Sequence, residues 1–204
     1  MRLFIVRHGE TDWNKEGKVQ GHTDIPLNEH GRCLAQKTAK GLQHIKFDLA
    51  FTSPLIRAKE TAQILLGDRQ IPLYEDERIK EICFGSCEGL TCKGENLDPG
   101  SEEFNKFFTD TARYIPSNGA ETIEQLYERT GSFLKELTER NDLDGKQILI
   151  STHGAAMTAL LNRIDGNMKI DNFWKNKVPK NCAVTVIDVQ CGIPVISERE
   201  VVYY

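Results

Sequence analysis

The stretch LFIVRHGE, residues 3–10, decides how this chain folds. It places four consecutive apolar residues directly before Arg7 and His8. The same arrangement recurs at residues 49–51, before the tripeptide TSP, and at residues 148–150, before the tripeptide STH. Short apolar runs that end at polar residues are typical of buried parallel strands. We therefore predict three such strands, each followed by a loop or a helix.

Local signals also predict helices between the strands. Pro54 suits the first turn of a helix, which apolar residues at helical spacing continue as far as Leu65. Thr122 and Gln125 form a capping-box pattern before a long amphipathic segment that extends to Leu137. Both segments are therefore expected to form helices that cover the sheet.

The last part of the chain predicts two further strands. Residues 183–189 and 193–197 flank Gly192 and are expected to form a hairpin. Strands that alternate with helices imply an α/β fold, here a three-layer sandwich with a mainly parallel central sheet flanked by helices. In such folds ligands bind at the carboxyl ends of the strands, so the first three strand ends should line one crevice.

Composition and charge restrict the class of protein. The chain has 204 residues, of which 39% are hydrophobic and 27% charged, so it is expected to be globular and to bury a core without disulfides. A net charge of −4 and a pI near 5.8 argue against nucleic acid as the main partner. The first apolar run is too short for a signal peptide or a membrane span, so we expect a cytoplasmic location and six free thiols.

The predicted strand ends deliver positively charged side chains. Arg7 and His8 follow the first strand, Arg57 lies one turn into the next helix, and His153 follows the third of the apolar runs. Arginine forms paired hydrogen bonds with oxyanions, and two arginines facing two histidines favour a tetrahedral anion such as phosphate. This set predicts a local anion pocket on an acidic protein.

A glycine follows each of these two histidines, at Gly9 and Gly154. A residue without a side chain lets backbone N–H groups approach an anion at a strand-to-helix turn. Phosphoryl transfer without a metal needs a nucleophile in line, and the sequence has no cysteine five residues before an arginine, no DxDxT motif and no cluster of Asp and His ligands. Histidine remains, because a neutral imidazole can attack phosphorus when its other ring nitrogen donates a fixed hydrogen bond.

Five motifs follow one another along nearly the whole chain and resemble those of the histidine phosphatase superfamily, also called the phosphoglycerate mutase-like family. In this order the set is highly specific for that family. The resemblance implies phosphoryl transfer through a phosphorylated histidine. The motifs are RHGETDWN (7–14), GHTDIPLNEHG (21–31), TSPLIRAKETA (52–62), IKEICFGSCEG (79–89) and STHGA (151–155).

The resemblance also implies roles for single residues. His8 would be transiently phosphorylated, and Glu81 would protonate the leaving oxygen before it activates the hydrolytic water. Glu88 is the next candidate for this acid role. The other implied contacts are Arg7, Asn14, Arg57 and His153 with the transferring phosphoryl group, and Gln20 and Gly21 with the rest of the substrate.

Two positions depart from the family pattern. Cys87 stands where tryptophan is usual in the FGxWEG motif, and Ala155 stands where a glycine is often found after the late HG. Neither change removes a catalytic group, but both bear on substrate preference if they border the pocket. The remaining histidines, His22, His30 and His44, are interpreted as solvent-facing or structural.

We expect one histidine phosphatase-like domain over residues 1–204, with a small cap insertion at about residues 91–121. The cap region holds an aromatic cluster that is either a local core or a cover over the crevice. The cluster consists of Phe104, Phe107, Phe108 and Tyr114, and the cationic candidates in the cap are Lys93, Lys106 and Arg113.

These observations favour a metal-independent phosphomonoesterase of the histidine acid phosphatase type, which acts on small phosphorylated metabolites and needs no cofactor. The alternatives are a cofactor-dependent phosphoglycerate mutase and a catalytically silent protein that binds a phospholigand. The expected partner is a small-molecule phosphate ester, without nucleic acid or membrane, and a homo-oligomer is left open.

Overall fold

The computed structural model describes residues 1–204, and its strands form one six-stranded sheet. The strands are β1 (Arg2–Arg7), β2 (Leu49–Thr52), β3 (Leu73–Glu75), β4 (Gln147–Thr152), β5 (Val184–Gln190) and β6 (Ile193–Val201). They lie in the order β3-β2-β4-β1-β5-β6. The pairs from β3 to β1 are parallel, and the pairs β1–β5 and β5–β6 are antiparallel. The mainly parallel sheet and the hairpin near the end of the chain are both confirmed.

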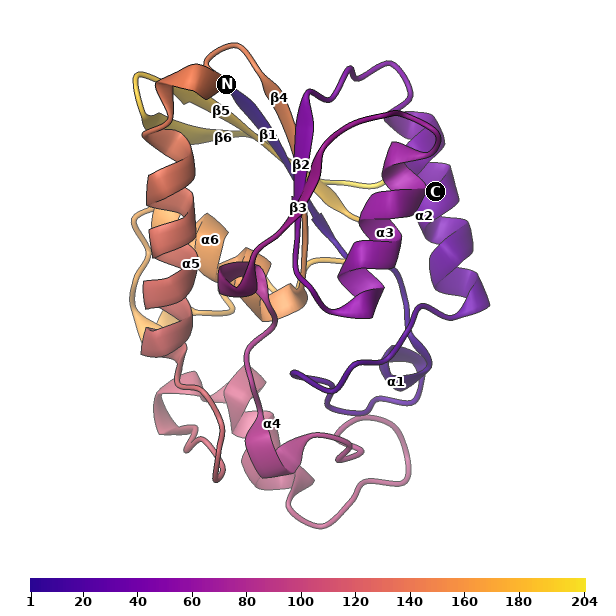
Figure 1. The fold of residues 1–204 in the computed structure, drawn as a ribbon. Coiled ribbons are helices and arrows are strands. Elements are labelled where there is room, and N and C mark those ends of the chain that lie inside the picture. Colours follow the sequence, from indigo (N-terminus) through magenta and orange to yellow (C-terminus); the bar gives the residue numbers. More distant parts are fainter.

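Helices cover both faces of this sheet. They are α1 (Asp12–Lys15), α2 (Glu29–Gly41), α3 (Ile56–Leu66), α4 (Ser101–Thr109), α5 (Ile123–Thr138) and α6 (Gly154–Ile164). The pair α2 and α3 lies on one side of the sheet and the pair α5 and α6 on the other (Figure 1). The three-layer sandwich is therefore confirmed. None of the helices combines the length and the apolar character that crossing a membrane requires.

The two faces of β1 explain its unbroken apolar run. Leu3 and Ile5 belong to the core cluster that includes residues of α5 and α6, whereas Phe4 and Val6 belong to the cluster on the side of α3. A strand that is buried on both faces has no polar alternation, because every side chain enters a core. This is why four consecutive apolar residues identify the strand.

The structure confirms the predicted start of one helix and corrects that of another. The capping box is confirmed, because the Thr122 hydroxyl accepts the Gln125 N–H and the Gln125 side chain accepts the Thr122 N–H. Helix α3 begins at Ile56, so Pro54 lies before the helix rather than in its first turn. The Asp24 carboxylate accepts the Ile56 N–H at 2.7 Å, and this contact from a distant loop fixes where the helix starts.

Some elements carry weak sequence signals and were not predicted. β3 has three residues at the edge of the sheet, and its Tyr74 and Glu75 are exposed, so it contains no apolar run. Helix α4, together with the short 3-10 helix η3 (Thr111–Arg113), occupies the segment predicted to be a cap. Helix α4 and η3 both lie beyond the carboxyl ends of β1 and β4 (Figure 1).

Candidate active site

A cavity of about 120 Å³ opens at the carboxyl ends of the central strands. The register of β1 and β4 pairs Arg7 with Thr152, so His8 and His153 leave neighbouring strands side by side. Their ring centroids are 5.1 Å apart. Of the predicted site residues, His153 is buried and does not line the cavity, whereas all the others do. These lining residues are Arg7, His8, Asn14, Gln20, Gly21, Arg57, Glu81 and Gly154.

His8 is held in one tautomer. Its Nδ1–H donates to the carbonyl of Gly9 over 2.6 Å, because a carbonyl can only accept, and the lone pair is therefore on Nε2. Burial, together with the guanidinium groups of Arg57 and Arg7, holds the pKa of His8 well below its usual 6.5. The imidazole is thus neutral at pH 7, which a nucleophile requires.

The guanidinium groups of Arg57, which is buried, and Arg7, which is half-buried, line the same cavity. Arg7 donates to the carbonyl of Pro179 at 2.6 Å, and Arg57 donates to the carbonyls of Gly21 at 2.7 Å and Thr23 at 3.0 Å. The Nε atom of each arginine is buried without a protein partner. Burial lowers the pKa of Arg57 to about 10 and also lowers the pKa of Arg7, so both groups are charged at pH 7. Cations that carry buried N–H groups without a protein partner form a site for an anion.

His153 lies beside His8 and has one ring nitrogen without a protein partner. Its Nε2 lies 2.7 Å from the Ser53 hydroxyl, and that hydroxyl accepts the Leu55 N–H, so its own proton can point to Nε2. Nδ1 then carries the ring proton, and this atom is buried without a protein partner. Burial, with Arg57 and His8 nearby, holds the pKa of His153 well below its usual range. The ring can therefore donate a hydrogen bond while neutral.

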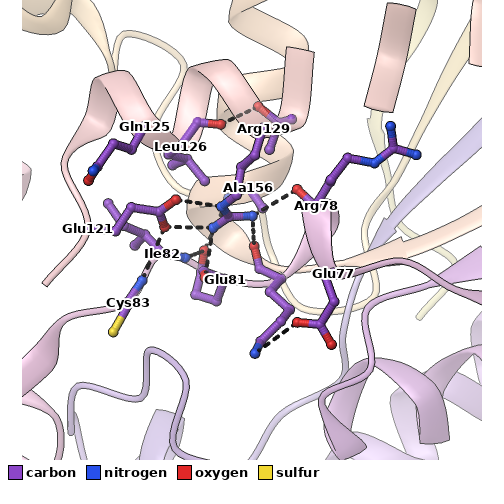
Figure 2. Close-up of polar contacts among 12 residues, drawn as sticks. Glu77, Arg78, Glu81, Ile82, Cys83, Glu121, Gln125, Leu126, Arg129 and Ala156 are labelled. Carbon is purple, nitrogen blue, oxygen red and sulfur yellow. Dashed lines mark hydrogen bonds and ion pairs between the residues drawn. The ribbon is translucent and has the colours of Figure 1, made fainter. Parts of the chain in front are cut away.

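The carboxylate of Glu81 caps the N-terminus of α6 and lines the cavity. Its Oε1 accepts the N–H groups of Ala155 and Ala156 at 3.1 Å each, and that of Ile82 at 3.0 Å (Figure 2). A Cβ atom added to Gly154 would lie 3.6 Å from Oε2 of Glu81, so a larger side chain there would enter the space beside the carboxylate. The structure thus brings Glu81 to the same cavity as His8, from a segment without regular structure.

Gly21 acts through its backbone. Its φ angle is +54°, and an added Cβ atom would lie 2.1 Å from Oε1 of Glu88. Both the conformation and the close approach require glycine. Because its carbonyl accepts the Arg57 guanidinium, Gly21 also fixes the position of that side chain.

Two amide side chains complete the wall near the anion site. The Asn14 Oδ1 accepts the Thr11 N–H at 3.2 Å, and the Gln20 Oε1 accepts the Thr11 hydroxyl proton at 2.9 Å. Since both amide oxygens are used within the loop, the amide N–H groups of Asn14 and Gln20 remain as donors for a ligand.

The remaining wall of the cavity is largely aromatic. Phe104, Phe107 and Phe108 of α4 line it, and the first two also pack against Tyr114. The cluster therefore forms a local core and also lines the cavity wall. Trp174 lines the cavity too, and its indole N–H donates to the Phe107 carbonyl at 2.7 Å. The sequence analysis missed Trp174, because this contact joins segments 67 residues apart and leaves no local pattern.

Two lysines also line the cavity. Lys93 is the only one of the three cationic cap candidates to do so, and its Nζ lies 4.9 Å from the ring centroid of Phe108. Lys106 and Arg113 instead form ion pairs with acidic residues of their own segment. Lys18 was missed by the sequence analysis, although its position two residues before Gln20, a predicted substrate contact, was a usable signal.

The two departures from the family pattern have different positions. Ala155 lines the cavity and donates its N–H to Glu81, so this departure does border the pocket. Cys87 does not line the cavity and packs against the aromatic core instead, so this departure does not border it.

Glu88 has a different task from Glu81. Its carboxylate accepts the N–H groups of His22, Thr23 and Phe84 and the hydroxyl proton of Thr23, and it does not line the cavity. Burial alone would raise the pKa of Glu88, but these hydrogen bonds together lower it. Glu88 therefore joins two loops and is a poor proton donor.

The remaining histidines lie outside the cavity wall. His30 and His44 are exposed, and His22 is half-buried and donates its Nε2–H to the carbonyl of Glu81 at 2.8 Å. Their interpretation as solvent-facing or structural is confirmed.

The comparisons with known proteins agree with this architecture. The family model of the histidine phosphatase superfamily (branch 1) matches residues 3–200. The uncharacterized phosphatase PhoE of Bacillus subtilis is 39% identical over 164 residues, which cover 80% of this chain and 77% of that protein. The solved structure of Bacillus stearothermophilus YhfR superposes with a TM-score of 0.86 at 32% identity and covers 97% of this chain and 95% of its own.

A mutase is among the relatives as well. The 2,3-bisphosphoglycerate-dependent phosphoglycerate mutase of Parvibaculum lavamentivorans is 30% identical over 206 residues, which cover 97% of this chain and 90% of the mutase. The chain belongs to the histidine phosphatase superfamily. It is an enzyme of that superfamily, in which both phosphatases and mutases are its relatives.

Proposed function

We propose that this chain is a metal-independent phosphomonoesterase that hydrolyses small phosphorylated metabolites through a phosphohistidine on His8. The observation that carries the proposal is the buried, neutral imidazole of His8, which is fixed through Nδ1 in a cavity that Arg7 and Arg57 also line. The two guanidinium groups can hold the anionic oxygens of a phosphoryl group while Nε2 remains free to attack phosphorus.

In the first step, Nε2 of His8 forms a bond to phosphorus and the bond from phosphorus to the ester oxygen breaks. Arg7, Arg57 and the Nδ1–H of His153 stabilise the nonbridging oxygens. Glu81, in its protonated form, transfers its proton to the leaving oxygen, so that a neutral alcohol departs.

In the second step, water replaces the alcohol. The Glu81 carboxylate accepts a proton from this water as the water oxygen attacks phosphorus, and the bond from phosphorus to Nε2 breaks. Inorganic phosphate leaves, His8 is neutral again, and Glu81 is ready for another cycle.

The rest of the wall supports a substrate with an apolar or aromatic remainder. The side chains of Phe104, Phe108 and Trp174 offer ring surface, and Lys93 lies over the Phe108 ring. A flat apolar group can stack on these rings, and one carboxylate or similar group can reach the lysine. We infer that monoesters with a single phosphate suit the site best.

A cofactor-dependent phosphoglycerate mutase is the second candidate, because a mutase is among the relatives. A bisphosphorylated intermediate carries a second phosphate that needs its own cations. Apart from Arg7 and Arg57, the only cations on the cavity wall are Lys18 and Lys93, and Lys18 is already paired with Glu16 at 2.7 Å. This charge distribution favours hydrolysis. We expect negligible exchange between 2- and 3-phosphoglycerate with the bisphosphate primer supplied, whereas exchange faster than phosphate release from any monoester would reverse the assignment.

A single experiment tests the proposed reaction. The protein is incubated with 4-nitrophenyl phosphate, phosphate release is followed, and a sample is quenched without acid for mass spectrometry. We expect turnover and a mass gain of one phosphoryl group on the peptide that contains His8. A label on serine, cysteine or aspartate would refute the mechanism, and neither release nor label would favour a silent binding protein.

A further inference from the structure

Arg129 of α5 holds the segment that carries Glu81. We propose that Arg129, together with Glu121, is a positioning residue that fixes Glu81 at the site of proton transfer. The inference rests on the proposed function, in which Glu81 is the proton donor. Neither Arg129 nor Glu121 lines the cavity, so any effect on the reaction must pass through Glu81 or through its neighbours.

The guanidinium group of Arg129 uses all five of its N–H donors (Figure 2). Nε and Nη2 donate to the two carboxylate oxygens of Glu121. The other three donate to main-chain carbonyls, those of Arg78 and Lys80 at 2.8 Å and that of Glu81 at 2.9 Å. Lysine, with three donors on one nitrogen, cannot reproduce this planar fork.

The segment that receives these bonds has little regular structure of its own. The carbonyl of Arg78 belongs to the short 3-10 helix η1 (Glu77–Ile79), and residues 80–84, which follow it, form neither helix nor strand. The carbonyl of Ile79 accepts the Thr152 hydroxyl proton at 2.7 Å. The backbone of this segment is therefore fixed by side chains from α5 and β4, because it makes no backbone hydrogen bonds to a neighbouring strand.

Glu121 is tied to the same segment. Its N–H donates to the carbonyl of Cys83 at 2.9 Å, and its side chain accepts the Cys83 N–H. The side chains of Glu121 and Arg129 are 14% and 20% exposed, so water competes little with their ion pair. The pair thus connects the start of α5 to both flanks of Glu81.

Glu81 itself is held at both its backbone and its side chain. The carbonyl accepts N–H groups from Arg129 and, on a separate bond of 2.8 Å, from His22. The carboxylate accepts the N–H groups of Ala155 and Ala156. Because a displacement of about 1 Å in a reacting group can cost about 100-fold in rate, loss of the backbone contact should be felt in proton transfer.

The test compares variants on two esters that differ in the leaving group. Arg129→Lys keeps the charge and loses the fork, and Glu121→Gln keeps the size and loses the carboxylate. With phenyl phosphate, whose leaving oxygen needs a proton, each variant should lower kcat about 100-fold. With 4-nitrophenyl phosphate, whose leaving oxygen needs little protonation, the loss should stay below about tenfold.

A double variant separates positioning from general damage. Glu81→Gln alone should show the same dependence on the leaving group. Adding Arg129→Lys to Glu81→Gln should cause little further loss on phenyl phosphate, because the proton donor is already absent. Arg163→Lys is the matched control, since Arg163 also donates to a carbonyl of α5, that of Tyr127 at 2.9 Å, without a contact to Glu81. It should affect both esters equally and slightly.

The outcomes distinguish this inference from the proposed function. Equal losses on both esters in Arg129→Lys and Glu121→Gln, with the leaving-group dependence kept in Glu81→Gln, would overturn the positioning role alone. If the unmodified chain hydrolyses neither ester, the proposed function fails and the inference fails with it.

A second measurement does not depend on turnover. The amide protons of Ala155 and Ala156 donate to Glu81, so displacement of Glu81 should speed their exchange with solvent. We expect faster exchange at both amides in Arg129→Lys and no change in Arg163→Lys. Unchanged exchange in Arg129→Lys would also refute the inference.

Discussion

His8 can react only through Nε2, because Nδ1 donates to the carbonyl of Gly9. The substitution His8→Ala should therefore abolish the phosphoenzyme and lower kcat by about a thousandfold or more. The fold should persist, because the side chain lies at a cavity wall, and circular dichroism can verify this. His44→Ala, which changes an exposed histidine, serves as the control and should retain full turnover. Substantial turnover by His8→Ala would rule out the nucleophile proposed here.

The burial of His8 and His153 makes the stability of the folded chain depend on pH. The pKa values of His8 and His153 are held well below 6.5, chiefly by burial and then by Arg57. Below pH 6.5 the unfolded chain binds protons on these two rings that the folded chain does not, so the free energy of unfolding falls as the pH falls. Each ring contributes up to about 1.4 kcal/mol per pH unit until its folded pKa is reached.

Urea unfolding at pH 7 and pH 5.5, in buffer without phosphate, measures this dependence. His153→Asn should lose less stability between the two values than the unmodified chain does. The control His44→Ala should keep the full loss, because that ring is exposed in the fold. An identical loss in all three proteins would contradict the assignment of neutral, buried rings.

Two neighbouring phenylalanines of helix α4 differ in burial, and we expect one to stabilise the fold and the other to contact substrate. Phe107 is buried among the rings of Phe84, Tyr114 and Trp174, and Phe107→Ala should lower the free energy of unfolding by about 3–5 kcal/mol. Phe108 is only half-buried at the cavity wall. Phe108→Ala should raise KM for aryl phosphates several-fold with a smaller loss of stability, as steady-state kinetics and thermal melting can measure. If KM for aryl and alkyl phosphates rises equally, the aromatic contact with substrate is wrong.

The charge of the whole molecule is negative, yet its cavity is lined by the buried Arg57 and the half-buried Arg7. In the proposed mechanism these cations would supply the positive field that a metal ion supplies in other phosphoryl-transfer enzymes. No three His, Cys, Asp or Glu side chains are arranged to hold a metal ion. Activity should therefore be unchanged within error after dialysis against EDTA. Vanadate should inhibit competitively, as an analogue of the transferring phosphoryl group. A large loss in EDTA that one divalent ion restores would contradict metal independence.

The sequence by itself determined the local elements and the residues at their ends. The apolar runs at residues 3–6, 49–51 and 148–150 predict strands because both faces of the central strands pack against core side chains, including those of the covering helices. The capping box at Thr122 predicts the start of α5 from the sequence, because its hydrogen bonds join residues only three positions apart. The placement of Arg7 and His8 follows from β1 alone. The family motifs identified the other predicted site residues, all of which except His153 line the cavity.

Only the tertiary structure decided how those residues are held. The cap that Glu81 places on α6, the bonds from Arg129 to the segment of residues 78–81, and the approach of Trp174 to α4 join parts of the chain that are far apart in sequence. The start of α3 was misplaced for the same reason, since Asp24 sets it from another loop. Local patterns record which face of an element is buried, whereas such hydrogen bonds depend on the distance and direction between elements, which packing alone fixes.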